Sequence, residues 1–152
     1  MNIARAGWVL CFCVGLCATA QASDRDLPWA FKGRPAEGYS IDLVSIEPEP
    51  GTKLEVGSSV DFKLTVSYEM SVADHGSIIL VFQDEKNRSV TNGAAPVVKE
   101  VTGNKGVVSL TATITVPKGI KEIRLFVPLQ PAGLTVTYGE LTFRYPVVRA
   151  RK

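Results

Sequence analysis

Apolar and polar residues alternate strictly along two stretches of the chain. Apolar side chains recur at Val60, Phe62, Leu64, Val66 and Tyr68, and again at Val108, Leu110, Ala112, Ile114 and Val116. A period of two places successive side chains on opposite faces of a β-strand, so each stretch predicts a strand with one buried and one wet face. Leu64 and Leu110 fall on the buried phase and Thr111 on the wet phase.

Further apolar runs predict more strands. Ile78 to Phe82 is apolar on both phases, as in a strand covered on two sides, and Ile123, Leu125 and Val127 form another alternating set. Turn residues rich in Gly, Pro and Asn recur about every 8 to 16 residues and separate the runs, which is typical of a two-sheet sandwich. We place about seven strands at 39–46, 58–68, 77–84, 96–102, 106–116, 121–129 and 134–148.

Three details refine these strands. Pro128 cannot donate to a β-ladder, so we expect strand 121–129 to stop pairing near Val127. The apolar phase of the last strand slips before Leu141, and a bulge at Gly139-Glu140 would absorb the slip. Four aromatic residues fall on inward phases and are expected in the core, namely Tyr68, Tyr138, Phe143 and Tyr145.

A family resemblance follows from one part of this pattern. The stretch Gly57 to Tyr68, then Ser71 to Gly76 and an apolar strand ending in Gln83-Asp84, resembles the bacterial extracytoplasmic immunoglobulin-like modules of the CARDB-like and fibronectin III-like kind. The resemblance covers 39–148 and rests on strand spacing and turn placement. It implies an immunoglobulin-like fold and a binding or spacing role, and it carries over no catalytic residue.

The start of the chain has the pattern of an export signal. Arg5 precedes an uncharged apolar run from Ala6 to Cys17, and Ala20-Gln21-Ala22 offers a signal-peptidase site. The run is shorter than the ~20 residues that span a bilayer, so we expect no transmembrane segment. Leu16 is bulky where a lipid-anchor site before Cys17 would need a small residue. The sequence thus predicts a cleaved signal peptide and a periplasmic or secreted protein.

Composition and charge fit one ordinary domain. The 152 residues are 45% hydrophobic and 21% charged, with a net charge of +2. This balance lacks the excess of cations that draws proteins to nucleic acid, so we expect no nucleic-acid partner. The predicted fold class is all-β, a single immunoglobulin-like two-sheet antiparallel sandwich. Its expected organisation is a signal peptide at 1–22, an irregular lead-in at 23–38, the sandwich at 39–148 and a basic tail at 149–152.

Little in the sequence supports catalysis. All three cysteines lie in the first 17 residues and His75 is the one histidine. Its neighbour Asp74 is too close in sequence to orient it as in a catalytic triad. The carboxylate pairs Glu47 with Glu49 and Asp84 with Glu85 are interpreted as turn residues. We therefore expect no enzyme activity and no catalytic residue.

Metal ligands are equally sparse. Met70 and His75 would make half a copper site, without a second histidine or another methionine after the signal peptide. Asp84, Glu85 and Asn87 match no calcium loop of fixed spacing. We expect no metal site and no cofactor.

Two places could bind a partner. In an immunoglobulin-like sandwich the loops at 69–76, 103–105 and 130–133 emerge at one end, which would gather Met70, Asp74, His75, Asn104, Lys105 and Gln130. Trp29, in the lead-in, is either a plug over the sandwich or a stacking surface.

The leading functional interpretation is a non-catalytic module that binds a protein or an envelope component. A small carbohydrate-binding module, or an accessory subunit of an exported enzyme or metal-handling system, are the alternatives. Exposed flat aromatic side chains would favour the carbohydrate, and an apolar patch or an unpaired strand edge would favour a protein partner.

Overall fold

The computed structural model describes residues 29–32, 37–91, 95–134 and 136–150. The predicted signal peptide, most of the predicted lead-in and the last two residues of the tail lie outside this part. The described residues form nine strands: β1 (Ala30–Lys32), β2 (Tyr39–Glu47), β3 (Leu54–Glu55), β4 (Ser59–Met70), β5 (His75–Asp84), β6 (Val97–Thr102), β7 (Lys105–Thr115), β8 (Glu122–Pro131) and β9 (Glu140–Val148). In the described residues, no helix has the length and hydropathy needed to cross a membrane.

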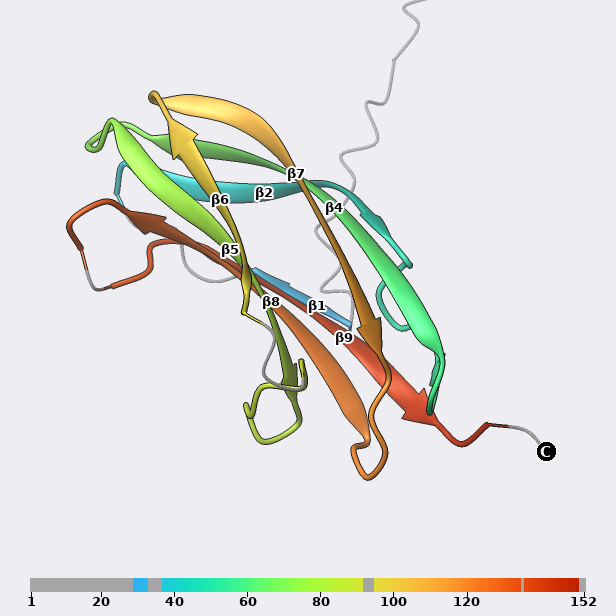
Figure 1. Ribbon diagram of the computed structural model, residues 1–152. Helices are drawn as coiled ribbons and strands as arrows, with labels where there is room; N and C mark the ends of the chain where they lie inside the picture. Colours follow the sequence, from blue (N-terminus) through green and yellow to red (C-terminus); the bar gives the residue numbers. More distant parts are fainter. Residues whose placement is uncertain (1–28, 33–36, 92–94, 135, 151–152) are drawn as a thin grey trace, which may run out of the picture.

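The strands form two sheets that pack face to face (Figure 1). One sheet has the order β1-β9-β8-β5-β6, with β3 also paired to β9, and the other has the order β2-β4-β7. Every pairing is antiparallel except that of β3 with β9. The predicted all-β, two-sheet sandwich is therefore confirmed, and the strand expected at 96–102 is β6, beside β5.

The core lies between the sheets and follows the alternation of the sequence. Leu64 of β4 and Leu110 of β7 are directly opposite each other and almost fully buried, whereas Thr111 is exposed. Phe62 stands at the centre, in edge contacts with Phe82 of β5 and Tyr145 of β9. The inward aromatic phases are confirmed: three of these side chains are buried, and Tyr138 stacks on Tyr39 at a centroid distance of 4.7 Å.

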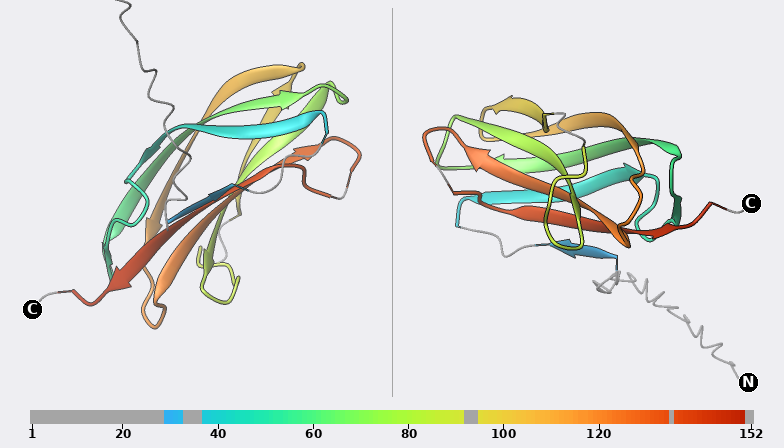
Figure 2. Two further views of the ribbon diagram at one scale, coloured as in Figure 1. Left: turned by 180° about the vertical axis from the view of Figure 1, so that it is seen from behind. Right: turned by 60° about the horizontal axis from the view of Figure 1, so that its bottom comes forward.

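The expected irregular lead-in at 23–38 is wrong for three residues. Ala30–Lys32 forms β1, which pairs with β9 and runs beside it in Figure 2. Three residues are too few to show a period, and their partners lie more than a hundred positions further along the chain. The two-residue strand β3 could not be predicted from the sequence for the same reason.

Pro128 does not end the pairing of β8, contrary to expectation. It is opposite Glu140 of β9, and β8 continues to Pro131. On the β5 side the pairing stops after Ile78↔Leu129 and resumes at Val81↔Phe126. The missing N–H of Pro128 therefore interrupts one ladder locally, because pairs on both sides keep the strand in register.

The last strand begins at Glu140, so the expected strand at 134–148 starts too early: Leu134 and residues 136–139 are described and do not belong to a strand. The expected irregularity is nonetheless found beside Gly139. Leu129 accepts a hydrogen bond from the N–H of Tyr138 (2.8 Å) and donates one to the carbonyl of Gly139 (3.2 Å), so two residues oppose one. Gly139 has φ +73°, which glycine adopts without strain.

Candidate functional site

The three loops expected at one end of the sandwich do meet there. The N–H of Met70 donates to the carbonyl of Asn104 at 2.6 Å, and the N–H of Gly103 donates to the carbonyl of Asp74 at 2.8 Å. The third loop joins through Ala132, whose N–H donates to the carbonyl of His75 at 2.9 Å. These bonds define the loop end, and the geometry expected from the sequence is confirmed.

The predicted residues of the loop end are not all at its surface. Asp74, His75, Asn104 and Lys105 are exposed, whereas Met70 is fully buried. Met70 was wrongly expected on the rim, because β4 extends to it and keeps its inward phase, with its sulfur packed against Gly76.

Gln130 is half-buried, and its amide donates to the carbonyl of Leu134 at 3.0 Å. Binding at the loop end stays a prediction.

Trp29 lies away from the loop end. Its indole covers Gly51, where an added Cβ would come within 2.7 Å of the indole Cδ1, and its carbonyl accepts the N–H of Arg144. Gly51 follows the end of β2, whereas the start of β2 pairs with Met70 at the loop end. Trp29 is 39% exposed, so it packs on a turn and also presents part of its ring.

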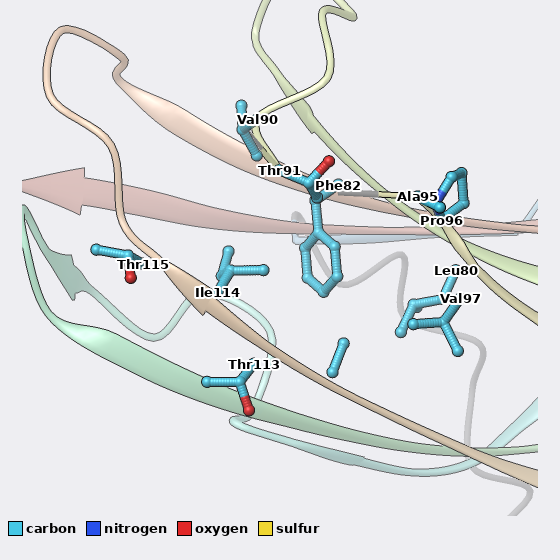
Figure 3. A pocket seen from close by; sticks show the side chains of 11 residues that line it. Leu80, Phe82, Val90, Thr91, Ala95, Pro96, Val97, Thr113, Ile114 and Thr115 are labelled. Carbon is cyan, nitrogen blue, oxygen red and sulfur yellow. The ribbon is translucent and has the colours of Figure 1, made fainter. Parts of the chain in front are cut away.

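A groove lined by apolar side chains and three threonines, Thr91, Thr113 and Thr115, opens between the two sheets on the side of β6 and β7, where the sequence predicted no site. The two strands leave the turn at Gly103 and separate, because β6 belongs to one sheet and β7 to the other (Figure 1). The hollow between them has a volume of about 320 Å³. Figure 3 shows the Phe82 ring in it, flanked by Ile114 of β7 and Val97 of β6. No charged side chain is among the described residues that line it.

The groove runs along a strand edge. Within the described residues β7 pairs with β4 alone, so its other edge faces the hollow. Ala112 and Ile114 of β7 line the hollow. Ser109 and Thr111 of the same strand are exposed on its outer face. An unpaired strand edge offers backbone N–H and C=O groups in the spacing that an extended chain requires.

The loop after β5 that brings Val90 to the groove is held by one buried carboxylate. Asp84 accepts the N–H groups of Lys86 (2.8 Å) and Arg88 (2.9 Å), and its other oxygen lies 2.6 Å from Nη2 of Arg88. Burial acts to raise the pKa of Asp84, but these hydrogen bonds and the charge of Arg88 outweigh it and lower the pKa to about 2. Val90 then donates to the carbonyl of Phe82 at 3.1 Å.

Three of the four carboxylates considered for chemistry have structural partners, and Glu47 is the first, with Nζ of Lys63 at 3.7 Å. Asp84 forms an ion pair with Arg88, and Glu85 accepts a hydrogen bond from the N–H of Lys121 at 3.2 Å. Glu49 stands in the turn closed by Thr52, which donates to its carbonyl. No group of three or more His, Cys, Asp or Glu side chains that could hold a metal occurs in the part of the chain described.

Comparison with known proteins gives only distant likenesses. No family model and no curated protein matches the chain. Among solved structures, a CARDB domain from Pyrococcus furiosus, in complex with di-metal ions, is 10% identical over 80% of this chain and 96% of its own, with a TM-score of 0.45. This domain is of the kind that the sequence resembles.

Two further structures are similar. A β-glucosidase from Listeria innocua is 16% identical over 74% of this chain and only 16% of its own, with a TM-score of 0.43. The CBD1 domain of Calx, in its apo form, is 9% identical over 74% of this chain and 98% of its own, with a TM-score of 0.37.

Proposed function

We propose that the chain is an exported, non-catalytic binding module whose groove between β6 and β7 takes an extended, apolar segment of a partner protein in the cell envelope. The observation that carries the proposal is the hollow of about 320 Å³, whose described lining is uncharged and mainly apolar, beside the edge of β7 that no described strand pairs with. Hollows of this size are common for ligand pockets. Export is supported by the signal-peptide pattern at 1–22.

The chemistry of the groove selects the kind of partner. Free N–H and C=O groups of a strand edge are best satisfied by another extended backbone, which adds a strand to the sheet. Alternate side chains of such a strand would then point into the hollow against Phe82, Val97 and Ile114. An uncharged lining favours apolar side chains, because burying a charge there would be costly.

Single cysteines allow a direct test, since the three cysteines of the sequence all precede the predicted cleavage site. We would place a cysteine at Ala95, an exposed residue at the groove rim, and a matched one at Ser109 on the outer face of β7. Each folded variant is labelled with a photo-crosslinker and irradiated with the envelope fraction of its own cells. We expect a discrete cross-linked partner from Ala95→Cys alone. Equal products from both positions, or none from Ala95→Cys, contradict the proposal.

A blocking variant gives the second test. Ala112→Phe adds an aromatic ring on the hollow side of β7, and Ser109→Phe adds the same ring on the opposite face. Partner capture should fall with Ala112→Phe and persist with Ser109→Phe. Thermal unfolding of both variants shows whether Ala112→Phe is folded. Labelling of the folded Ala95→Cys variant with a bulky inert maleimide blocks the groove without a change in the core, and it should also reduce partner capture.

A further inference from the structure

A second hollow, which the proposed function does not use, lies on the outer face of the sheet that contains β5, β8 and β9. It has a volume of about 420 Å³ and is lined by Gln83, Asn87, Arg124, Phe126, Thr142 and Arg144. The strand register makes it an ordered surface: Gln83, Arg124 and Arg144 are opposite one another across β5, β8 and β9. Phe126 and Thr142 form a pair in the same face, two residues along.

Two arginines face each other directly in this hollow. Like charges opposite each other across two strands are destabilising, so the pair needs an offset. Glu122 supplies one: its Oε1 lies 2.7 Å from Nε of Arg124 and 4.0 Å from Nε of Arg144. A single carboxylate shared by two guanidinium groups leaves one positive charge uncompensated, on side chains that remain 25% and 45% exposed.

Neighbouring carboxylates do not neutralise that charge. Asp84, at the end of β5, is paired with Arg88, and Glu85 is not among the residues that line the hollow. Among the described residues that line the hollow, none is acidic. The hollow therefore has a net positive lining.

The remaining groups are those that recognise sugar hydroxyls. Asn87 accepts a hydrogen bond from Nη1 of Arg124 at 3.1 Å through its carbonyl oxygen, and its amide can still donate. Gln83 adds a second amide and Thr142 a hydroxyl, beside the half-buried ring of Phe126. Guanidinium groups bind carboxylates by charge-assisted, often bidentate hydrogen bonds.

We propose that this hollow binds an acidic glycan through the carboxylate of a uronic acid residue. Arg144, the more exposed arginine, contacts the carboxylate together with Arg124. Asn87, Gln83 and Thr142 contact the ring hydroxyls, and Phe126 supplies the apolar floor.

The test is a calorimetric titration of the protein with a galacturonic acid trimer, carried out at low and at moderate salt. The variant is Arg144→Gln, and the matched control is Lys63→Gln, which removes a cation from the outer face of the other sheet. We expect at least about tenfold weaker binding from Arg144→Gln, the loss typical of one charge-assisted hydrogen bond. Lys63→Gln should bind as the unmodified chain does.

Three other probes separate the ligand chemistries. A neutral galactose trimer should bind at least about tenfold more weakly than the acidic trimer, and inorganic phosphate or acetate alone should not compete at equal concentration. Equal affinity for the neutral trimer, or competition by phosphate at equal concentration, overturns the proposal. So does an equal loss from Arg144→Gln and Lys63→Gln, which would indicate diffuse charge attraction.

Folding of the variant is checked by thermal unfolding. Because Arg144→Gln relieves the repulsion from Arg124, its unfolding midpoint should not be lower than that of the unmodified chain. Thr142→Val, which keeps a β-branched residue of similar shape in β9, supplies an independent variant that should weaken the acidic trimer but not alter the fold. Unchanged binding by both variants also overturns the proposal.

Discussion

Tyr145 of β9 donates a hydrogen bond from its hydroxyl to the carbonyl of Pro48, 97 positions away, at 2.9 Å. The bond joins a central strand of one sheet to the turn that follows β2 in the other. Tyr145 is fully buried, and burial raises the pKa of its hydroxyl, so the neutral form is retained. The contact is thus both a packing and a polar link between the two layers.

Removal of this hydroxyl should weaken the sandwich. We expect Tyr145→Phe to lower the free energy of unfolding by about 1 kcal/mol, because Pro48 loses its hydrogen-bond donor while the ring stays in place. Urea unfolding at pH 7 measures the loss. Since the folded pKa of Tyr145 is raised, its stabilising effect is present below the unfolded pKa and declines as pH rises above about 10. A difference between the two proteins that does not shrink at alkaline pH would contradict this assignment.

Core position can be tested on one cross-strand pair. Leu64→Ala and Leu110→Ala should each cost about 2 to 5 kcal/mol, because each opens a cavity between the sheets. Thr111→Ala, next to Leu110 but exposed, should change stability by less than about 0.5 kcal/mol. Denaturant midpoints of the three variants decide the matter, and similar losses at Leu110 and Thr111 would mean that the register of β7 is wrong.

The carboxylate of Asp84 should set the acid limit of the fold. Its pKa is lowered in the folded chain to about 2, from an ordinary value of 3.8. The stability it contributes is therefore complete above the ordinary pKa and is lost as pH falls from about 4 towards 2. We expect Asp84→Asn to be less stable at pH 7 and to lose less of its stability over this acid range. If the free energies of unfolding of the two proteins fall equally between about pH 4 and pH 2, the expectation is contradicted.

Gly51 and Trp29 offer a spectroscopic test. Gly51 has φ +86°, and a side chain there would meet the indole. Gly51→Ala should cost about 1 kcal/mol or more and displace the ring, because alanine is strained at positive φ. Trp29 is the only tryptophan after the predicted cleavage site, so its fluorescence should move to the red. Gly57→Ala, at a position with φ +83° and open space around it, controls for the backbone alone.

The rival sites can be separated from the groove by two variants. If the groove binds the partner, the double variant His75→Ala with Lys105→Ala and the single variant Trp29→Ala should both keep the cross-link obtained with Ala95→Cys. Loss of the cross-link in the double variant would instead assign binding to the loop end. Loss in Trp29→Ala alone would assign it to the lead-in.

The long strands could be predicted because each buries one face, and burial leaves a period of two in the sequence. Errors arose where a strand is too short for a period, as in β1, or where pairing on both sides overrules a local preference, as at Pro128. Met70 was misplaced because the end of β4 was put two residues too early.

The two hollows depend on long-range pairing. Ile114 and Val97 have the pattern of ordinary core residues, and only the sheet order shows that they flank an opening. Arg124 and Arg144 each fall on an outward phase, and only the register makes them opposite. If the strand pairing is predicted first, a search for like charges that face each other on outward positions can find Arg124 and Arg144.

The short strands β1 and β3 both lie along the free side of β9. On β2, the bulge between Leu43 and Ser45 breaks the regular edge, and Lys32 of β1 forms an ion pair with Asp42 there. The edges of β6 and β7 border the same groove, so one inserted segment occupies the space beside both. Strand-by-strand growth of a fibre requires an open edge on each of two sides of a subunit. In the described residues the edge of β2 is broken by this bulge, so a strand that the groove is proposed to accept would not find a regular second edge at β2 on which the ladder could continue. The proposed association through the groove would therefore end with a single complex.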